Sequence, residues 1–411
     1  MKTKLRLLFP ILALCVLSCD STEEKTTTSK TEIWRFTLQL GEDDLPFTAK
    51  LLADDTLISG FTVINAEEEI ELMPAEEKIS HRAVFDFPVY PSRIVLQRES
   101  PDLITGYWED FDRDDYRIPL VGERGKDFRF TPTKSTTAVA PRYKVRFGTE
   151  EKGYDGLLEL QNDKGKLSGT FLTQSGDYRY LSGNIMNGKV NLSTFDGNHA
   201  YLFDALISGD SLASGRYLSG NHFSNRWHGL ADTVFTLRHP TEVTVPTEET
   251  RAFRFSLPDR DGKLVDSENL YAQNNVYIFQ ITGSWCPNCK DASQAMHALI
   301  TEYDRPDLVF LPINFERYED LDKARGRIDK MHRDLNLPKE FLFGGKADKA
   351  TTSEALPGID GVRAYPTIII TNRQGKMGRI FSGFYGPATG LRHERLMEDI
   401  YQSVDSLLKT S

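Results

Sequence analysis

The 411-residue chain is poor in cysteine and carries no excess of positive charge. It has four cysteines, of which Cys15 and Cys19 lie near the N-terminus and Cys286 and Cys289 lie far along the chain. A structural zinc site needs about four ligands, and the chain has no second Cys-x-x-Cys pair that could complete one with Cys286 and Cys289. The formal net charge of −10 is spread along the chain, which argues against a nucleic-acid partner. The sequence therefore predicts no zinc centre on these cysteines, no cofactor and no nucleic-acid binding.

Long apolar runs are also missing. The apolar segment 7–17 follows a basic N-terminal stretch and is too short to span a membrane. It ends in Val-Leu-Ser-Cys at residues 16–19, which resembles a bacterial lipobox. We therefore expect a signal peptide over 1–18 and a lipid anchor on Cys19 that holds the protein at a membrane, facing the periplasm or the cell surface. A plain signal peptide is the alternative.

The polar stretch 19–32 is expected to be a flexible tether, because it offers almost no apolar side chains to bury. Hydrophobic residues make up 39% of the chain and charged residues 27%, as in ordinary globular proteins. The length leaves room for about two or three domains beyond this tether.

Residues 33–240 consist of short β-like segments separated by Gly, Asp and Asn turns, and they predict an antiparallel β domain. An offset of 109 residues aligns Trp34 with Tyr143 and also places two Ser-Gly pairs in register. This favours two repeated halves, 33–132 and 142–240, each with about four or five strands. The pattern leaves open whether the halves form one closed barrel or two packed sheets.

The second half also concentrates polar and aromatic residues that a binding site could use. These are Asn198, His199, Asn221, His222, Trp227 and His228. Two interpretations stay open: a metal or small-ligand site, and the ordinary polar rim of a β domain.

A polar linker is expected at 241–250.

From 251 to 411, strands alternate with helices and end in a hairpin and a last helix, which predicts an α/β domain with a mixed sheet. The buried-strand pattern at 276–282 leads into the sequence Trp-Cys-Pro-Asn-Cys at 285–289, and one apolar helical face follows it.

A Cys-x-x-Cys pair at a strand-to-helix turn points to thiol chemistry. The first turn of a helix presents free N–H groups and the positive end of the helix dipole, so it stabilises a thiolate. Pro287 suits the first helical position. We therefore expect Cys286 to be an exposed N-cap thiol, and Cys289 to lie one turn further in, within reach of a disulfide.

With these motifs, residues 251–411 resemble the thioredoxin-fold domain of TlpA-like, AhpC/TSA-related thiol–disulfide oxidoreductases, which are membrane-tethered lipoproteins in Gram-negative bacteria. The resemblance implies that Cys286 attacks a substrate disulfide and that Cys289 resolves the mixed disulfide. It further implies that Trp285 packs beside them. Pro366, after Tyr365, matches the family's cis-proline, whose loop binds the substrate backbone.

Two departures from the family pattern affect the expected chemistry. Thioredoxins carry a buried carboxylate where this chain has Gln280, and Glu316 is the candidate replacement; the alternative for Glu316 is a solvated loop acid. The dipeptide between the cysteines, Pro287-Asn288, lacks the histidine of strongly oxidising members, which leans toward a reductant.

The leading hypothesis is a lipid-anchored disulfide reductase that acts on disulfide-containing protein substrates and receives electrons from an upstream membrane donor. One alternative is a ligand- or protein-binding surface lipoprotein whose β domain is the working part. The other is a peroxiredoxin-like peroxidase, but Gly283 stands where that chemistry would place a threonine hydroxyl.

Overall fold

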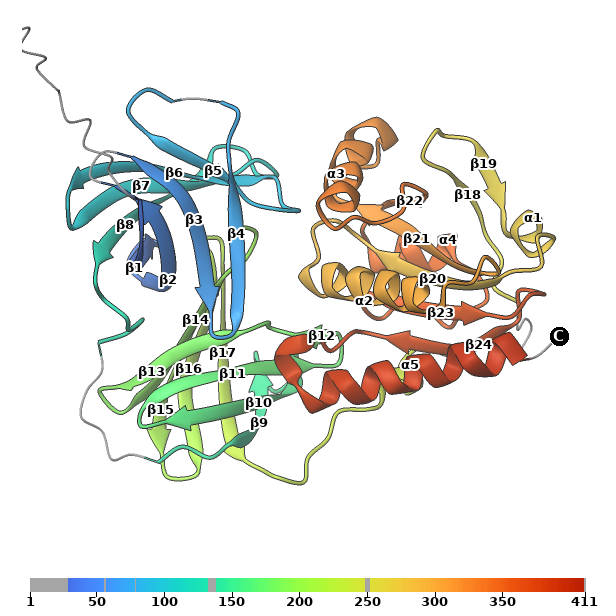
Figure 1. Cartoon of the computed structure of the whole chain (residues 1–411). Helices are drawn as coiled ribbons and strands as arrows, with labels where there is room; N and C mark the ends of the chain where they lie inside the picture. Colours follow the sequence, from blue (N-terminus) through green and yellow to red (C-terminus); the bar gives the residue numbers. More distant parts are fainter. Residues whose placement is uncertain (1–28, 55–56, 78, 132–137, 248–251, 410–411) are drawn as a thin grey trace, which may run out of the picture.

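The computed structural model describes residues 29–54, 57–77, 79–131, 138–247 and 252–409, which form two β-barrels and one α/β unit (Figure 1). Cys19 and the expected signal peptide lie outside the described residues. Within these ranges, no helix is long and apolar enough to cross a membrane.

The first barrel, called barrel 1, is a closed ring of antiparallel strands in which β1 pairs with both β2 and β8. Alternate side chains of β1 are buried, including Trp34, Phe36 and Leu38, because successive residues of a strand point to opposite faces. The strands are β1 (Lys30–Gln39), β2 (Asp44–Ala53), β3 (Ile58–Asn65), β4 (Glu68–Pro74), β5 (Ala83–Asp86), β6 (Ser92–Ser100), β7 (Leu103–Asp110) and β8 (Tyr116–Arg124).

The second barrel, barrel 2, closes because β10 pairs with both β9 and β11, while the short β12 adds to β11. Its strands are β9 (Arg142–Phe147), β10 (Tyr154–Asp163), β11 (Lys166–Thr173), β12 (Gly176–Asp177), β13 (Leu181–Met186), β14 (Lys189–Phe195), β15 (Ala200–Ser208), β16 (Ser211–Ser219) and β17 (Phe223–Ala231).

The fold class, with two repeated β halves, is confirmed, and each half is a barrel of its own. Trp34 and Tyr143 hold equivalent places: each lies on a first strand that pairs with the second and the last strand of its barrel. The expectation of four or five strands per half is wrong, because each ring contains eight. The sequence did not reveal β17, whose only large buried side chain is Trp227.

The α/β unit has a thioredoxin fold, with a mixed sheet in the order β22-β21-β20-β23-β24. Strands β20, β21 and β22 are parallel, and β23 and β24 run antiparallel to their sheet neighbours. The strands are β20 (Val276–Thr282), β21 (Leu308–Glu316), β22 (Leu342–Lys346), β23 (Thr367–Thr371) and β24 (Met377–Ser382).

The helices α2 (Pro287–Tyr303) and α5 (Leu391–Lys409) share one apolar core on one face of this sheet. On the other face, α4 (Lys349–Ala355) packs together with the chain around β18 (Ser256–Pro258). The helix α3 (Leu321–Asp334) packs against β22. The remaining elements are β19 (Leu264–Asp266), α1 (Ser267–Tyr271), and the 3-10 turns η1 (Pro240–Glu242) and η2 (Pro387–Thr389).

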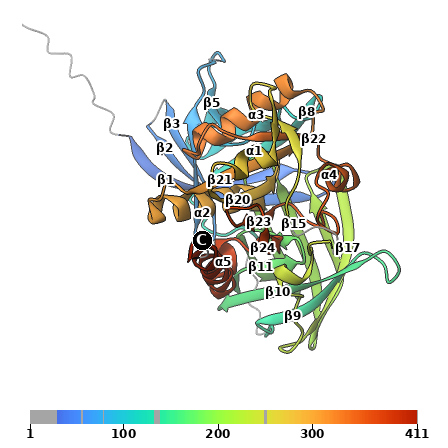
Figure 2. The ribbon, with the colours of Figure 1, turned by 90° about the vertical axis from the view of Figure 1, so that its right-hand side faces the viewer.

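The three units share apolar cores instead of touching only at their surfaces. Phe195, at the end of β14 in barrel 2, belongs to the core of barrel 1, where its ring lies 4.9 Å from Phe47 and 5.1 Å from Trp108. On the outer side of barrel 2, Leu157 and Leu172 join the core beneath α5, and Figure 2 shows α5 beside β10 and β11.

The segment after barrel 2, which we expected to be part of a linker, packs on the α/β unit. Thr244 is fully buried, and its hydroxyl donates to the carbonyl of Gly361 at 3.1 Å. The backbone N–H of Thr247 donates to Gly358.

Phe195→Ala should lower the free energy of unfolding by about 3–5 kcal/mol, because it removes a large, fully buried ring and leaves a cavity in barrel 1. Urea denaturation followed by tryptophan fluorescence measures this change. Phe223→Ala is the matched control: this ring is 47% exposed, and its loss should cost less than about 1 kcal/mol. Equal losses for both variants would contradict the packing of barrel 2 into barrel 1.

Candidate active site

The Cys-x-x-Cys motif begins α2 at the end of a strand that is buried along its whole length. All seven residues of β20 are buried, and the chain then turns through Gly283 into the helix. Cys286 is the N-cap with an extended backbone, and its Sγ accepts the N–H of Cys289 at 3.2 Å. Pro287 occupies the start of the helix, where a missing N–H costs nothing. The predicted N-cap position of Cys286 is therefore confirmed.

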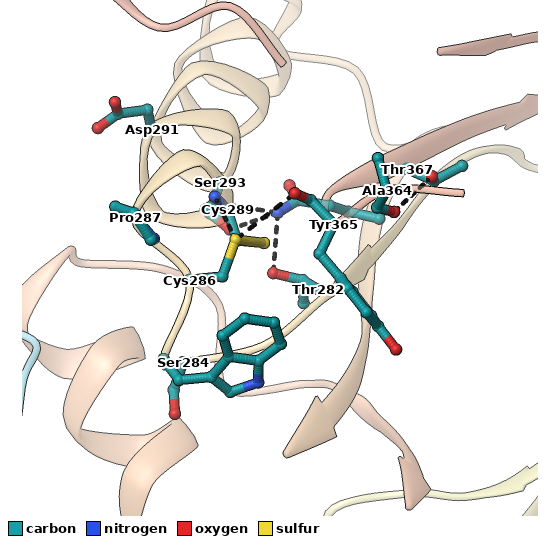
Figure 3. Close-up of a disulfide and its surroundings, with 12 residues drawn as sticks. Thr282, Ser284, Cys286, Pro287, Cys289, Asp291, Ser293, Ala364, Tyr365 and Thr367 are labelled. Carbon is teal, nitrogen blue, oxygen red and sulfur yellow. Dashed lines mark hydrogen bonds between the residues drawn. A yellow bond between two sulfur atoms is a disulfide. The ribbon is translucent and has the colours of Figure 1, made fainter. Parts of the chain in front are cut away.

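Cys286 and Cys289 are joined by a disulfide, with their Cα atoms 5.2 Å apart (Figure 3). The Sγ of Cys286 lies 3.7 Å from the backbone carbonyl oxygen of Tyr365. The peptide bond between Tyr365 and Pro366 is cis. The loop that precedes β23 therefore faces the disulfide, and the carbonyl of Tyr365 lies beside the sulfur of Cys286.

Trp285 and Tyr365 form the aromatic wall of the site. Their ring centroids are 5.4 Å apart in an edge-to-face arrangement. The indole Nε1 of Trp285 donates to the carbonyl of Phe315 at 3.0 Å, and the Tyr365 hydroxyl lies 2.6 Å from that of Thr352. Each ring is therefore fixed in orientation by the hydrogen bond of its polar group and by its packing against the other ring.

The expectation that Cys286 is exposed is wrong, because only 4% of its surface is accessible. Barrel 2 reaches the motif from the other side. Asn198, in the turn between β14 and β15, donates from Nδ2 to the carbonyl of Trp285 at 2.7 Å. A Cβ added to Gly176 would lie 1.8 Å from Nδ2 of Asn288, so only glycine permits this close approach. Sequence spacing gave no sign of these long-range contacts.

Glu316 is buried beside the motif, and the solvated alternative is wrong. Its two carboxylate oxygens accept from the backbone N–H and from the hydroxyl of Ser284, each at 2.8 Å. The parallel register explains this contact: Thr282 pairs with Asn314, so Glu316 comes level with Ser284 beyond the end of β20. Burial raises the pKa of Glu316 to about 7, although the hydrogen bonds from Ser284 act in the opposite direction.

Gln280 lies beneath the active-site helix and cannot titrate. Its Nε2 donates to the carbonyl of Cys289 at 3.1 Å, to Ser293 Oγ at 2.9 Å and to Thr282 Oγ1 at 3.0 Å. The amide therefore anchors the first turn of α2, while the buried carboxyl group beside the motif, that of Glu316, comes from the neighbouring strand.

The polar and aromatic cluster predicted in the second β half does not converge on one point. Trp227 is buried in the core of barrel 2, and His222 contacts Tyr116 and Arg113. Burial lowers the pKa of His222 to about 4. No group of three or more possible metal ligands is found among the described residues. Asn198 is the member of this cluster that bonds to the backbone beside the Cys-x-x-Cys motif.

No known protein family and no curated protein matches this chain. Solved structures resemble part of it. A secreted thiol-disulfide isomerase from Corynebacterium glutamicum is 17% identical, with a TM-score of 0.30 over 42% of this chain and 98% of that one. A thiol:disulfide interchange protein from Chlorobium tepidum is 19% identical, with a TM-score of 0.26 over 37% of this chain and 97% of that one. A thiol-disulfide oxidoreductase from Bacteroides fragilis is 20% identical, with a TM-score of 0.25 over 35% of this chain and 96% of that one.

Glu316→Gln should change how stability depends on pH. The pKa of Glu316 in the folded protein is about 7 against an ordinary 4.5. A raised pKa contributes stability that is complete below pH 4.5 and is lost as pH rises through 7. The wild-type protein should therefore lose roughly 3 kcal/mol relative to the variant between about pH 4.5 and 8.

Urea denaturation across this pH range measures the difference. Glu319→Gln, which removes an exposed carboxylate nearby, is the control and should follow the wild-type curve. Parallel curves for the wild type and Glu316→Gln would contradict the raised pKa.

Proposed function

We propose that the protein is a thiol–disulfide oxidoreductase that acts as a disulfide reductase on protein substrates. The observation that carries this proposal is the position of the Cys286–Cys289 disulfide at the start of α2, facing the carbonyl of Tyr365 before the cis peptide of Pro366. A thiolate formed at this N-cap would accept the N–H of Cys289 and would be favoured by the helix dipole.

In the reduced protein, the Cys286 thiolate attacks one sulfur of a substrate disulfide, and the other substrate sulfur leaves as a thiolate. Cys289, as a thiolate, then attacks Sγ of Cys286 and releases the second substrate thiolate. The internal disulfide forms again, and two electrons have passed to the substrate. A dithiol donor, which we place in the membrane, must return them before the next cycle.

The neighbouring residues have supporting roles in this scheme. Trp285 and Tyr365 orient the site, and the loop at Pro366 binds the substrate backbone. Pro287 starts the helix, and Glu316 exchanges protons at the motif, since its pKa lies near 7. The dipeptide between the cysteines has no histidine, which supports the direction of reduction.

Cys289→Ser should accumulate mixed disulfides with substrates, because the intermediate on Cys286 can no longer be resolved. Cys286→Ser should trap few or none, since Cys289 lies inside the first turn of α2, whereas Cys286 is the N-cap and its Sγ faces the loop at Tyr365. Both variants should lower the rate of insulin reduction by about 100-fold or more. In Cys289→Ser, Pro366→Thr should slow release of the trapped species.

Non-reducing electrophoresis and mass spectrometry of the trapped species test these roles, with Ser403→Ala as a variant remote from the motif. Equal trapping of the same partners by both cysteine variants would overturn the assigned roles. Wild-type protein that fails to reduce any disulfide after chemical reduction would overturn the function itself.

We also place the protein at a membrane, with a lipid on Cys19 after removal of residues 1–18, a tether over 19–32 and the working domains facing the periplasm or the cell surface. The lipobox-like sequence at 16–19 supports this. Wild-type protein should enter the detergent phase in phase partitioning, and Cys19→Ser should stay in the aqueous phase. Wild-type protein in the aqueous phase would contradict the anchor.

A further inference from the structure

We propose that Arg179, in barrel 2, is a positioning residue of the redox centre: by holding Asp291 and balancing the carboxylates around α2, it keeps the Cys286 thiol acidic. This inference rests on the proposed function, since it assigns a role in that same reaction. It makes the barrel domain a working part of the redox site.

The Arg179 side chain is almost fully buried, with 3% of its surface accessible, and it touches all three units. In the α/β unit, Nη1 donates to Asp291 Oδ2 at 2.7 Å and lies 3.5 Å from the carbonyl of Pro287. In barrel 1, Nη2 bonds to Glu68. In barrel 2 itself, Nε lies 3.9 Å from Asp196 Oδ2. One guanidinium therefore joins both barrels to the first turns of the active-site helix.

The backbone at Arg179 is held in an unfavourable conformation to reach this place. Its φ of +60° is in the left-handed region, which non-glycine residues adopt at a cost in free energy. Asp177 supports it: one carboxylate oxygen accepts the N–H of Arg179 at 2.7 Å, and the other accepts the N–H of Gly386 at 2.6 Å. Asp177 thus bonds both to the backbone of Arg179 in barrel 2 and to the backbone of Gly386 in the α/β unit.

The groups around Arg179 carry mostly negative charge. Carboxylates approach from β4 (Glu68), from β12 (Asp177), from the β14–β15 turn (Asp196) and from α2 (Asp291). Tyr90 also faces this cluster. Its further cations are Lys290 and, when protonated, His199, which lies 3.4 Å from Asp196. Removing Arg179 would therefore leave unbalanced negative charge along the helix that begins at Cys286.

Negative charge near a thiol disfavours the thiolate and raises its pKa. Pro287, which Arg179 approaches, is the residue directly after Cys286, while Figure 3 shows Asp291 on the flank of α2 away from Tyr365. Arg179 pairs with Asp291 on this flank and, among the hydrogen bonds of the described residues, makes none to the sulfur of Cys286, so its effect on Cys286 is electrostatic. A reduced form that is less stable also makes the disulfide harder to reduce, so the reduction potential becomes more negative.

The experiment measures the Cys286 pKa in reduced full-length protein, from the pH dependence of alkylation, together with the reduction potential. Arg179→Gln should raise the Cys286 pKa by about one unit and shift the potential to a more negative value. Arg179→Lys keeps the charge and should stay close to wild type. Asp291→Asn, with Arg179 in place, should lower the Cys286 pKa, and Arg179→Gln combined with Asp291→Asn should return it toward wild type.

Arg129→Gln is the matched control. Arg129 is also buried, but it joins only the two barrels, through Ser193 and Asn65, so its loss should lower stability and leave the Cys286 pKa unchanged. If Arg179→Gln lowers stability but leaves the pKa and the potential at their wild-type values, Arg179 is structural only and the inference is wrong. If Arg179→Gln fails to fold, an unchanged Cys286 pKa in Asp291→Asn overturns the inference in the same way. Wild-type cysteines that do not cycle between dithiol and disulfide would instead overturn the proposed function.

Discussion

The turn between β14 and β15 is the constraint on which the arrangement of the three units depends. Phe195 enters the core of barrel 1, and the carbonyl of Gly197 accepts from Ser92 and Trp108 there. Asp196 lies beside Arg179 of barrel 2, and Asn198 bonds to the backbone of Trp285. The burial of Phe195 fixes the turn in barrel 1. The polar groups of the turn keep their hydrogen-bond partners only if barrel 2 and the Cys-x-x-Cys motif hold their positions.

The surroundings of the Cys-x-x-Cys motif therefore come from all three units. In its own unit, Gln280 and Glu316 fix the start of α2 and the preceding turn. From outside, barrel 2 supplies Asn198 and Arg179, and barrel 1 supplies Glu68 to the same charge cluster. A buried arginine shared by several carboxylates stabilises an interface only while all its partners are present. In the reaction that we propose, both barrels would thus contribute to the electrostatic environment of the Cys286 thiol.

Glu316 and Gln280 occupy two neighbouring strands beneath the Cys-x-x-Cys motif. The strand that leads to the motif carries Gln280, which anchors the helix and does not titrate. The carboxyl comes from the end of the adjacent parallel strand, and the register brings it level with Ser284. The sequence could nominate Glu316 from its place at a strand end, but its burial and raised pKa depend on what covers it.

Local patterns determined much of this protein. Strand alternation predicted the β region, and the apolar run before Cys286 predicted a strand-to-helix turn, because these features depend on neighbours a few residues apart. The 109-residue offset predicted the repeat of the β region. The tertiary structure alone decided that each half closes as a barrel, that β17 completes the second ring, and that Cys286 is covered. Ring closure and interface burial join residues far apart in the chain, such as Asn198 with Trp285, and no local spacing encodes such contacts.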